Sequence, residues 1–363
     1  DVVLGGHLGD LINADEGDNV VIGDDAAIDY VRFERGGATP GADTNAADID
    51  FITSLSTTLN GGADNITTGN GNDIVIGGRD GDTITAGAGR NLVIGDSGTV
   101  TAANEDLNRF GTQPITVGRI ETIEFGDGGI DTITTLGGND VVLGGHLGDL
   151  INAGDGDNVV IGDDAAIDYV RVERGGATPG ADTNAADIDF ITSLSTTAAG
   201  GSDTITTGNG NDIIVGGRSG DTINAGNGNN IVVGDSAEII AANSDASRFG
   251  TQTITVGRIE TITTNDGGAD QITTGVGYDL IFGGMANDTI VANSGESTGP
   301  ADAGNVVLGD NGYIDFVRAE REASELGGDT NPADIDVIAS TAPADGGVDH
   351  ITTGLGLDIV IGG

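Results

Sequence analysis

The chain has 363 residues, with no Cys, no Trp, one Met and only 3% aromatic residues, which excludes a core of large aromatic side chains. Its 58 acids and 13 bases, all of them Arg, give a net charge of −45. Nucleic acids and anionic membranes are bound by basic patches, so we expect neither as a partner. The sequence has no apolar run of about 18 residues, so we expect no membrane insertion.

The first segment of the chain, DVVLGGHLGDLINA at 1–14, returns at 140–153, and a shorter unit is nested within this repeat. Repeats of this length indicate a solenoid, in which each unit buries its apolar face against its neighbours. We expect one continuous solenoid over 1–363, cut from a longer array because both ends fall at the same point of the repeat. The predicted units are about 1–72, 73–139, 140–211, 212–278 and 279–357, with 358–363 beginning a further unit.

Each unit has two parts. The first is a run of nine-residue repeats, which from residue 59 reads LNGGADNIT, TGNGNDIVI, GGRDGDTIT and AGAGRNLVI. The second is a longer excursion, such as 23–58, with two β-like stretches around a tip rich in Gly, Pro, Asp and Asn. This pattern predicts an elongated hairpin or a widened coil. Gly, Thr and β-branched residues dominate the chain, so we expect no helix.

The nine-residue repeats predict two classes of strand. After Asp64 and Asp82 the next three residues read NIT and TIT, so the central Ile would point inward between polar neighbours. After Asp73 and Asn91 they read IVI and LVI, and strands apolar on both faces are normally buried on both. Either the excursions or a neighbouring molecule must cover that sheet, and we favour the excursions because every unit has both features. One excursion supplies a matching apolar surface through Ile115, Val117, Ile123 and Phe125.

The nine-residue repeat resembles the RTX (hemolysin-type calcium-binding) nonapeptide, G-G-x-G-x-D-x-U-x, where U is large and apolar. TGNGNDIVI matches it closely, whereas GGRDGDTIT moves the glycine from the fourth place to the fifth. The resemblance covers roughly half of the chain and implies a right-handed parallel β-roll, in which six residues turn and bind Ca²⁺ and three form a strand. We therefore expect an all-β fold, a right-handed parallel β-roll or β-solenoid with repeated hairpin-like or widened-coil excursions.

The acids at this register are the predicted ligands of multiple Ca²⁺ ions. One Asp alone could merely serve its turn, but acids 18 residues apart would stack along one edge of the roll, where a shared ion cancels their repulsion. The sixteen acids at this register are Asp1, Asp10, Asp64, Asp73, Asp82, Asp131, Asp140, Asp149, Asp203, Asp212, Asp221, Asp270, Asp279, Asp288, Asp349 and Asp358. Less certain ligands, each directly before an excursion, are Asp24, Asp96, Asp163, Asp235 and Asp310.

One position in each unit carries an amide at this register, namely Asn19, Asn91, Asn158, Asn230 and Asn305. Asp73 would then face Asn91 rather than a second acid. We expect that edge to bind calcium more weakly unless Asp96 reaches it, so the roll should have two unlike edges.

Most arginines lie in the excursions, where VRFER, VRVER and VRAER recur. One interpretation is a ladder of salt bridges on the side of the solenoid, since Arg119 and Glu121 share a strand face. The other is an association patch that meets the acidic face of another copy. The patch would consist of Arg32, Arg35, Arg119, Arg171, Arg174, Arg258, Arg318 and Arg321.

We expect no enzymatic activity, because His7, His146 and His350 have no paired nucleophile by pattern and the chain has no G-x-S-x-G motif. The favoured function is a calcium-stabilised extracellular structural protein: a self-associating fibre, surface-layer or matrix subunit, secreted by a type I route. The alternatives are the stalk of a cell-surface adhesin and, with less support, an ice-binding Thr face or the non-catalytic tail of a secreted polysaccharide-active enzyme. Besides a second copy, the expected contacts are polysaccharide or a cell surface.

Overall fold

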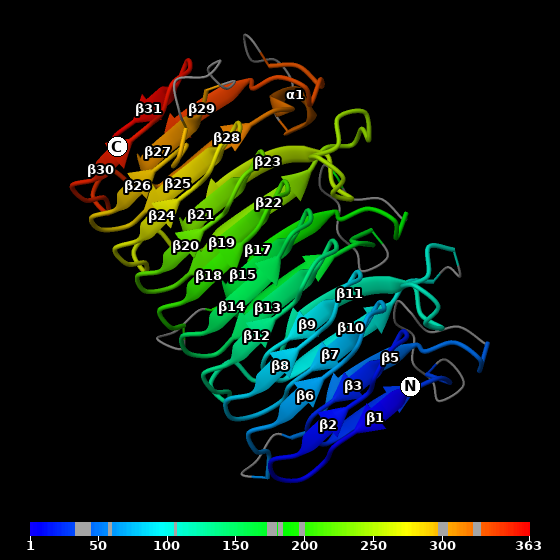
Figure 1. Cartoon of the computed structure of the whole chain (residues 1–363). Coiled ribbons are helices and arrows are strands. Elements are labelled where there is room, and N and C mark those ends of the chain that lie inside the picture. The colour runs from blue at the N-terminus through cyan, green and yellow to red at the C-terminus, as the bar shows by residue number, and fades with distance from the viewer. Residues whose placement is uncertain are drawn as a thin grey trace.

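Three sheets run along the whole solenoid (Figure 1). The computed structural model describes residues 1–32, 45–56, 60–104, 107–172, 180, 184–195, 200–296, 304–321 and 328–363. Two of the sheets are parallel and come from the nine-residue repeats, and the third is antiparallel and comes from the excursions.

The middle sheet contains the strands that are apolar on both faces. Its strands are β1 (Val2–Leu4), β3 (Val20–Ile22), β7 (Ile74–Ile76), β9 (Leu92–Ile94), β13 (Val141–Gly145), β15 (Val159–Asp163), β19 (Ile213–Gly217), β21 (Ile231–Asp235), β25 (Leu280–Gly284), β27 (Val306–Asp310) and β31 (Ile359–Ile361).

The polar sheet contains the strands with an inward Ile between outward neighbours. Its strands are β2 (Leu11–Asn13), β6 (Asn65–Thr67), β8 (Thr83–Thr85), β12 (Thr132–Thr134), β14 (Leu150–Gly154), β18 (Thr204–Thr207), β20 (Thr222–Asn224), β24 (Gln271–Thr273), β26 (Thr289–Val291) and β30 (His350–Thr352).

The hairpin sheet is built from the excursions, each of which forms an antiparallel hairpin that also pairs with the next hairpin. Its strands are β4 (Ala26–Asp29), β5 (Phe51–Ser54), β10 (Gly98–Ala102), β11 (Val117–Thr122), β16 (Ala165–Asp168), β17 (Phe190–Ser193), β22 (Ala237–Ala241), β23 (Val256–Thr261), β28 (Gly312–Asp315) and β29 (Val337–Ser340). The excursions are therefore hairpins and not widened coils.

The middle sheet is apolar on both faces because it lies between the other two. Val75 packs in one core with Ile66 and Ile84 of the polar sheet. Its neighbours Ile74 and Ile76 pack in a second core with residues of the hairpin sheet, such as Ile52 and Val100. All of these side chains are at most 1% exposed, so the predicted cover by the excursions is confirmed.

The hairpin face that supplies this cover differs in part from the expected one. Ile115 and Val117 join the second core as predicted, but Ile123 and Phe125 are only half-buried and Ile120 is buried there instead. The pairing of β10 with β11 shifts register between Thr101 and Ala102, which is a β-bulge. A bulge reverses the alternation of side chains, so residues an even number apart no longer share a face.

One short helix interrupts the all-β pattern. It is α1 (Arg318–Arg321), a single turn in the last hairpin. No helix in the part of the chain that the structure describes is long and apolar enough to cross a membrane.

The burial of the middle sheet under the hairpin sheet predicts how a substitution in the hairpins changes stability. Replacing Ile120, which is 1% exposed, with Ala should lower the free energy of unfolding in calcium by about 2–5 kcal/mol, the usual loss for a buried Ile. Chemical denaturation measures it. Thr101→Ala is the matched control, because Thr101 lies opposite Arg119 and is half-buried. Equal, small losses in the two variants would contradict the buried interface between the middle and hairpin sheets.

Candidate metal centre

The turns that lead from the middle sheet to the polar sheet form what we call the all-aspartate edge. Each carries an aspartate directly before the polar strand, and the row is Asp10, Asp64, Asp82, Asp131, Asp149, Asp203, Asp221, Asp270, Asp288 and Asp349. Each aspartate after Asp10 accepts, at Oδ1, a hydrogen bond from the backbone N–H of the preceding member, from Asp10 to Asp64 (2.6 Å) through to Asp288 and Asp349 (3.1 Å). The predicted stacked pairs, such as Asp64 with Asp82, are thus neighbours within one continuous row.

The second carboxylate oxygen of these aspartates is left without a partner. In all ten, Oδ2 is buried and makes no hydrogen bond to the described residues. Burial, together with the neighbouring carboxylates, raises the pKa of Asp149 and Asp221 to about 11 and that of Asp82 to about 10. Buried carboxylates retain their charge only beside a compensating cation. The row therefore has the electrostatics of a line of cation sites.

Glycines shape the space beside these oxygens. A Cβ on Gly77 would overlap the carbonyl oxygen of Gly95 and Asp82 Oδ2. The same arrangement recurs directly after the three apolar residues of each middle strand except the last, at Gly5, Gly23, Gly77, Gly95, Gly144, Gly162, Gly216, Gly234, Gly283 and Gly309. Only glycine, which has no Cβ, fits this closely beside a carboxylate oxygen and a backbone carbonyl.

The oxygens of this edge fit Ca²⁺, which takes six to eight oxygen ligands and accepts carbonyl as well as carboxylate oxygen. Among the described residues, no three His, Cys, Asp or Glu side chains are grouped so that they could hold a metal. An ion at this edge would therefore need carbonyl ligands in addition to the aspartates, and the glycine carbonyls beside each Oδ2 are placed to supply them.

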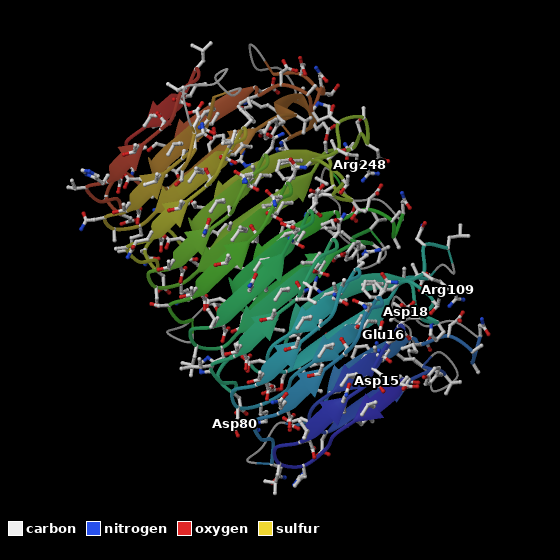
Figure 2. The ribbon with its side chains drawn as sticks, in the orientation of Figure 1. Asp15, Glu16, Asp18, Asp80, Arg109 and Arg248 are labelled. Atoms are coloured by element: carbon white, nitrogen blue, oxygen red, sulfur yellow. The ribbon has the colours of Figure 1, made fainter. Side chains whose placement is uncertain are left out.

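The turns on the opposite side, from the polar sheet to the middle sheet, form what we call the aspartate–asparagine edge. Here Asp1, Asp73, Asp140, Asp212, Asp279 and Asp358 alternate along the row with the five asparagines named above. The same backbone ladder joins them: Asn91 N–H donates to Asp140 Oδ1 at 2.7 Å, and Asp140 N–H donates to Asn158 Oδ1 at 3.0 Å. Figure 2 shows Asp80, from a turn of the all-aspartate edge, across the solenoid from Asp15, Glu16 and Asp18 of this one.

The less certain ligands lie at the all-aspartate edge. Asp96 accepts hydrogen bonds from the backbone N–H of Gly129 (2.9 Å) and of His146, and burial together with the Asp131 carboxylate raises its pKa well above the ordinary value. Asp24, Asp163 and Asp235 accept the equivalent pairs of backbone donors, and Asp310 accepts one from Gly347. Asp96 therefore does not reach the edge of Asp73 and Asn91, because it follows a middle strand, whereas Asp73 and Asn91 precede one.

Two arginines that the sequence did not single out join the bases of neighbouring hairpins. Arg79 is buried and forms an ion pair with Asp127, where the second hairpin ends. Its Nη1 also donates to the carbonyl of Ser56 at 3.3 Å, where the first hairpin ends. Arg218 and Asp266 repeat the ion pair in the next pair of hairpins. Their shared place in GGRDGD and GGRSGD was the available signal.

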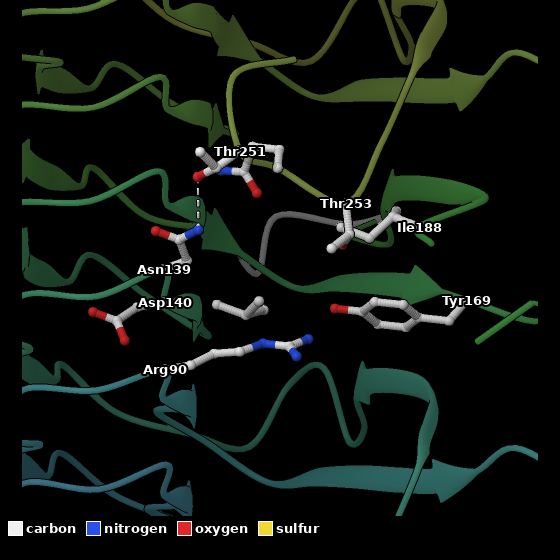
Figure 3. A pocket seen from close by; sticks show the side chains of 9 residues that line it. Arg90, Asn139, Asp140, Tyr169, Ile188, Thr251 and Thr253 are labelled. Atoms are coloured by element: carbon white, nitrogen blue, oxygen red, sulfur yellow. Dashed lines mark hydrogen bonds between the residues drawn. The ribbon is translucent and has the colours of Figure 1, made fainter. Parts of the chain in front are cut away.

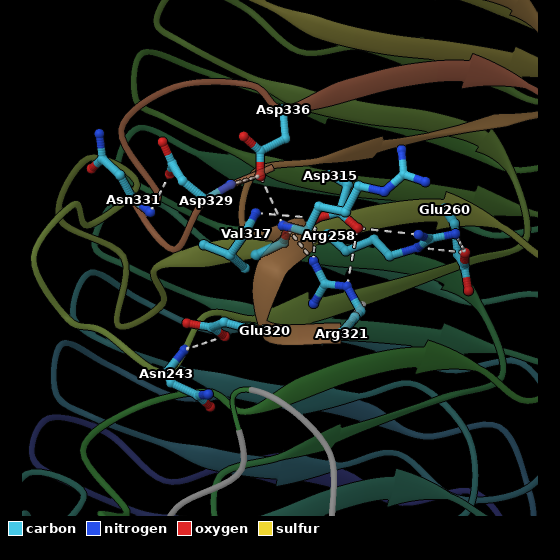
Figure 4. A network of polar contacts seen from close by, with 12 residues as sticks. Asn243, Arg258, Glu260, Asp315, Val317, Glu320, Arg321, Asp329, Asn331 and Asp336 are labelled. Carbon is cyan, nitrogen blue, oxygen red and sulfur yellow. Dashed lines mark hydrogen bonds and ion pairs between the residues drawn. The ribbon is translucent and has the colours of Figure 1, made fainter. Parts of the chain in front are cut away.

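The arginines of the predicted association patch make contacts within the chain. Arg119 Nε donates to Glu121 at 2.9 Å, and its Nη1 lies 3.2 Å from Asp168. Figure 4 shows the corresponding network at the C-terminal end, where Arg258 pairs with Glu260 and Asp315 and Arg321 pairs with Asp315. Arg32 and Arg171 stack on Phe51 (4.0 Å) and Phe190 (3.8 Å). Arg318 lies in α1, and Arg35 and Arg174 lie outside the described residues.

The histidines lie apart from one another. His7 Nδ1 lies 2.9 Å from Asp25 Oδ2, His146 occupies the corresponding turn 139 residues later, and His350 is exposed on β30. A cavity of about 220 Å³ next to the aspartate–asparagine edge is lined by Arg90, Asp140 and Tyr169 among others (Figure 3).

Comparison with known families matches the RTX calcium-binding nonapeptide repeat to residues 58–93, 67–101, 125–146, 197–236 and 264–298. These segments carry parts of both edges and leave out most of the hairpins. Repeats of this family bind Ca²⁺ and are generally non-catalytic. No curated protein sequence matches the chain.

The close approach of carboxylate and carbonyl oxygens to these glycines predicts a specific effect on calcium affinity. Gly77→Ala should weaken calcium binding measured by titration calorimetry, because the new methyl group would occupy the space between Asp82 Oδ2 and the Gly95 carbonyl. Gly126→Ala is the matched control, since no atom lies within 4 Å of its added Cβ. A calcium affinity for Gly77→Ala equal to that of the control would argue against ions at this edge.

Proposed function

The chain belongs to the proteins with RTX calcium-binding nonapeptide repeats, and we propose that it is an extracellular structural rod whose solenoid folds when calcium is present. The observation that carries this proposal is the row of ten buried, partnerless carboxylate oxygens along one edge. Bound calcium supplies the positive charge that such a row needs.

The size of the electrostatic repulsion between neighbouring carboxylates of the all-aspartate edge supports folding coupled to calcium binding. Neighbouring strands of a sheet are about 4.8 Å apart. At an effective dielectric constant of about 20, two unit charges at that separation repel by about 3–4 kcal/mol. Domains are stable by only about 5–15 kcal/mol, so a few uncompensated neighbours in the row would cancel the folding free energy. At neutral pH without calcium, the chain of net charge −45 would remain open.

A chain that folds only when calcium is present is suited to secretion. Extracellular calcium modules bind their ions at about 10⁻⁴–10⁻³ M, whereas cytosolic calcium is far lower, and metal binding supplies folding free energy when no site exists beforehand. An open chain inside the cell suits export through a type I route, and folding would follow outside. This supports an extracellular or cell-surface location.

Calcium removal tests the proposal. Excess chelator at neutral pH should abolish the β-sheet circular dichroism signal, and added calcium should restore it, whereas magnesium at the same concentration should restore less because it demands stricter octahedral geometry. A spectrum that does not change in chelator would refute calcium-dependent folding.

We propose that the rod associates with further copies of itself as a fibre, surface-layer or matrix subunit. The support is charge: arginines on the hairpin side are set on an otherwise acidic chain, and the acidic surface of a second copy is complementary to them. The alternative is a monomeric adhesin stalk. The exposed face of the polar sheet does pair Thr83 with Thr132 and Thr85 with Thr134, but the exposed Leu11 and Leu150 interrupt the threonines, so we do not extend the proposal to ice binding.

Association can be tested without disturbing the core. Replacing Arg32 and Arg171 with Gln should leave the circular dichroism of the calcium-loaded chain unchanged and reduce the assembled mass in sedimentation velocity. Arg90→Gln, which lines the cavity beside the aspartate–asparagine edge and lies outside the proposed patch, is the arginine control. Assembly that persists in the double variant would contradict the role of these arginines, and a wild-type chain that stays monomeric in calcium would favour the stalk.

A further inference from the structure

We propose that calcium is held along the all-aspartate edge alone, and that asparagine amides close the aspartate–asparagine edge in place of ions. The inference rests on the proposed calcium-bound solenoid. It departs from an RTX repeat with equivalent edges, because it assigns the ions to one side of the molecule.

The asparagine side chains already occupy the carbonyl oxygens that an ion would need. Asn91 Nδ2 donates to the carbonyls of Gly87 (3.0 Å) and Gly89 (3.3 Å) in its own turn. Asn158 Nδ2 donates in the same way to Gly156 (2.9 Å) and Gly154 (3.4 Å). Asn19 and Asn230 repeat the bond to Gly17 (2.6 Å) and Gly228 (3.1 Å).

The amide group is also fully used. Its Oδ1 accepts the backbone N–H of the preceding aspartate, as from Asp73 to Asn91 (3.2 Å) and from Asp140 to Asn158 (3.0 Å). Its NH₂ has no lone pair for a metal and presents partial positive charge to the carbonyls. In every second turn of this edge, the asparagine amide therefore makes the contacts to the turn carbonyls that an ion would otherwise make.

The two edges differ in the type of residue that stands five places before the aspartate or asparagine. At the all-aspartate edge it is glycine in the turns without a hairpin, as Gly77 is for Asp82 and Gly144 is for Asp149, and a Cβ there would overlap the carboxylate and carbonyl oxygens. At the aspartate–asparagine edge it is never glycine among the described residues. Buried Thr68, Thr135, Thr207 and Thr274 precede the aspartates, and buried Ala14, Ala86, Ala153 and Ala225 precede the asparagines.

This alternation of Thr and Ala matches what each turn must accommodate. Thr274 Oγ1 donates to Asp279 Oδ2 at 2.6 Å, so this hydroxyl takes the role of a carboxylate partner. Thr68 and Thr207 are buried near Asp73 and Asp212, but neither their hydroxyls nor the Oδ2 atoms of these aspartates make a hydrogen bond to the described residues. Thr135 Oγ1 donates to the Ala153 carbonyl of the next turn at 2.9 Å, and Asp140 Oδ2 is likewise buried without a hydrogen-bond partner among the described residues. In the asparagine turns, the small Ala leaves room for the amide.

The test compares two aspartates nine residues apart, on opposite edges of one coil. Asp149→Asn and Asp140→Asn make the same change, and in both the new amide oxygen can still accept the backbone bond, from Asp131 or from Asn91. Calcium per chain is measured by elemental analysis after dialysis against millimolar calcium, with circular dichroism to record folding. We expect Asp149→Asn to lose calcium and Asp140→Asn to retain the wild-type content. Equal loss in both variants would overturn the assignment.

A gain-of-site variant tests the same inference in the other direction. Ala153→Gly combined with Asn158→Asp recreates the glycine and aspartate of the all-aspartate edge between Asp140 and Asp212. It should bind more calcium than the wild type, and Ala153→Gly alone should not. No added calcium, or a double variant that stays unfolded in saturating calcium, would count against the inference. A wild-type chain that holds no calcium would instead refute the proposed function itself.

Discussion

The structure depends on how ten carboxylates are held one strand apart along a single edge. Their Oδ1 atoms accept backbone hydrogen bonds, which fixes the spacing, and their Oδ2 atoms are buried without a partner. Hydrogen bonds alone cannot neutralise the negative charge of that row, because each bond positions one oxygen and leaves the charge of the carboxylate unchanged. Either protons or cations must neutralise it, and the proposed function assigns this role to Ca²⁺.

The hairpin sheet solves a separate problem. A narrow roll buries only one face of each parallel sheet, but here the middle sheet is buried on both, with one core against the polar sheet and another against the hairpins. A third layer adds apolar burial that does not involve the metal edge directly. Strand pairing between neighbouring hairpins makes the cover continuous along the axis, and Arg79 and Arg218 each join the bases of one pair of hairpins. Such a three-layered rod should resist bending more than a two-sheet roll.

The strands could be predicted from the sequence because spacing and pattern carried the information locally. A nine-residue period placed each three-residue strand, and the difference between IVI at 74–76 and TIT at 83–85 indicated which sheet would be covered. The ladder of Asp and Asn followed from the same period. The assignment of Ca²⁺ to individual aspartates stays a prediction.

Other features depend on contacts that no short pattern encodes. Ile120 replaces Ile123 in the core because a bulge changes the alternation of β11, and a bulge is set by pairing with another strand. Asp96 lies at the all-aspartate edge because the chain has already crossed the middle sheet when it reaches that residue. The sequence shows Thr five places before each of these aspartates and Ala five places before each of these asparagines. Their roles can be assigned only from the hydrogen bonds that the structure shows in these turns.

The most direct measurement of this account is anomalous diffraction from crystals grown in calcium, recorded at a wavelength where calcium scatters anomalously. We expect a line of anomalous peaks beside the Oδ2 atoms of the all-aspartate edge, following the spacing of the turns. The absence of peaks along that edge from a folded chain would contradict the claim that cations hold the solenoid together.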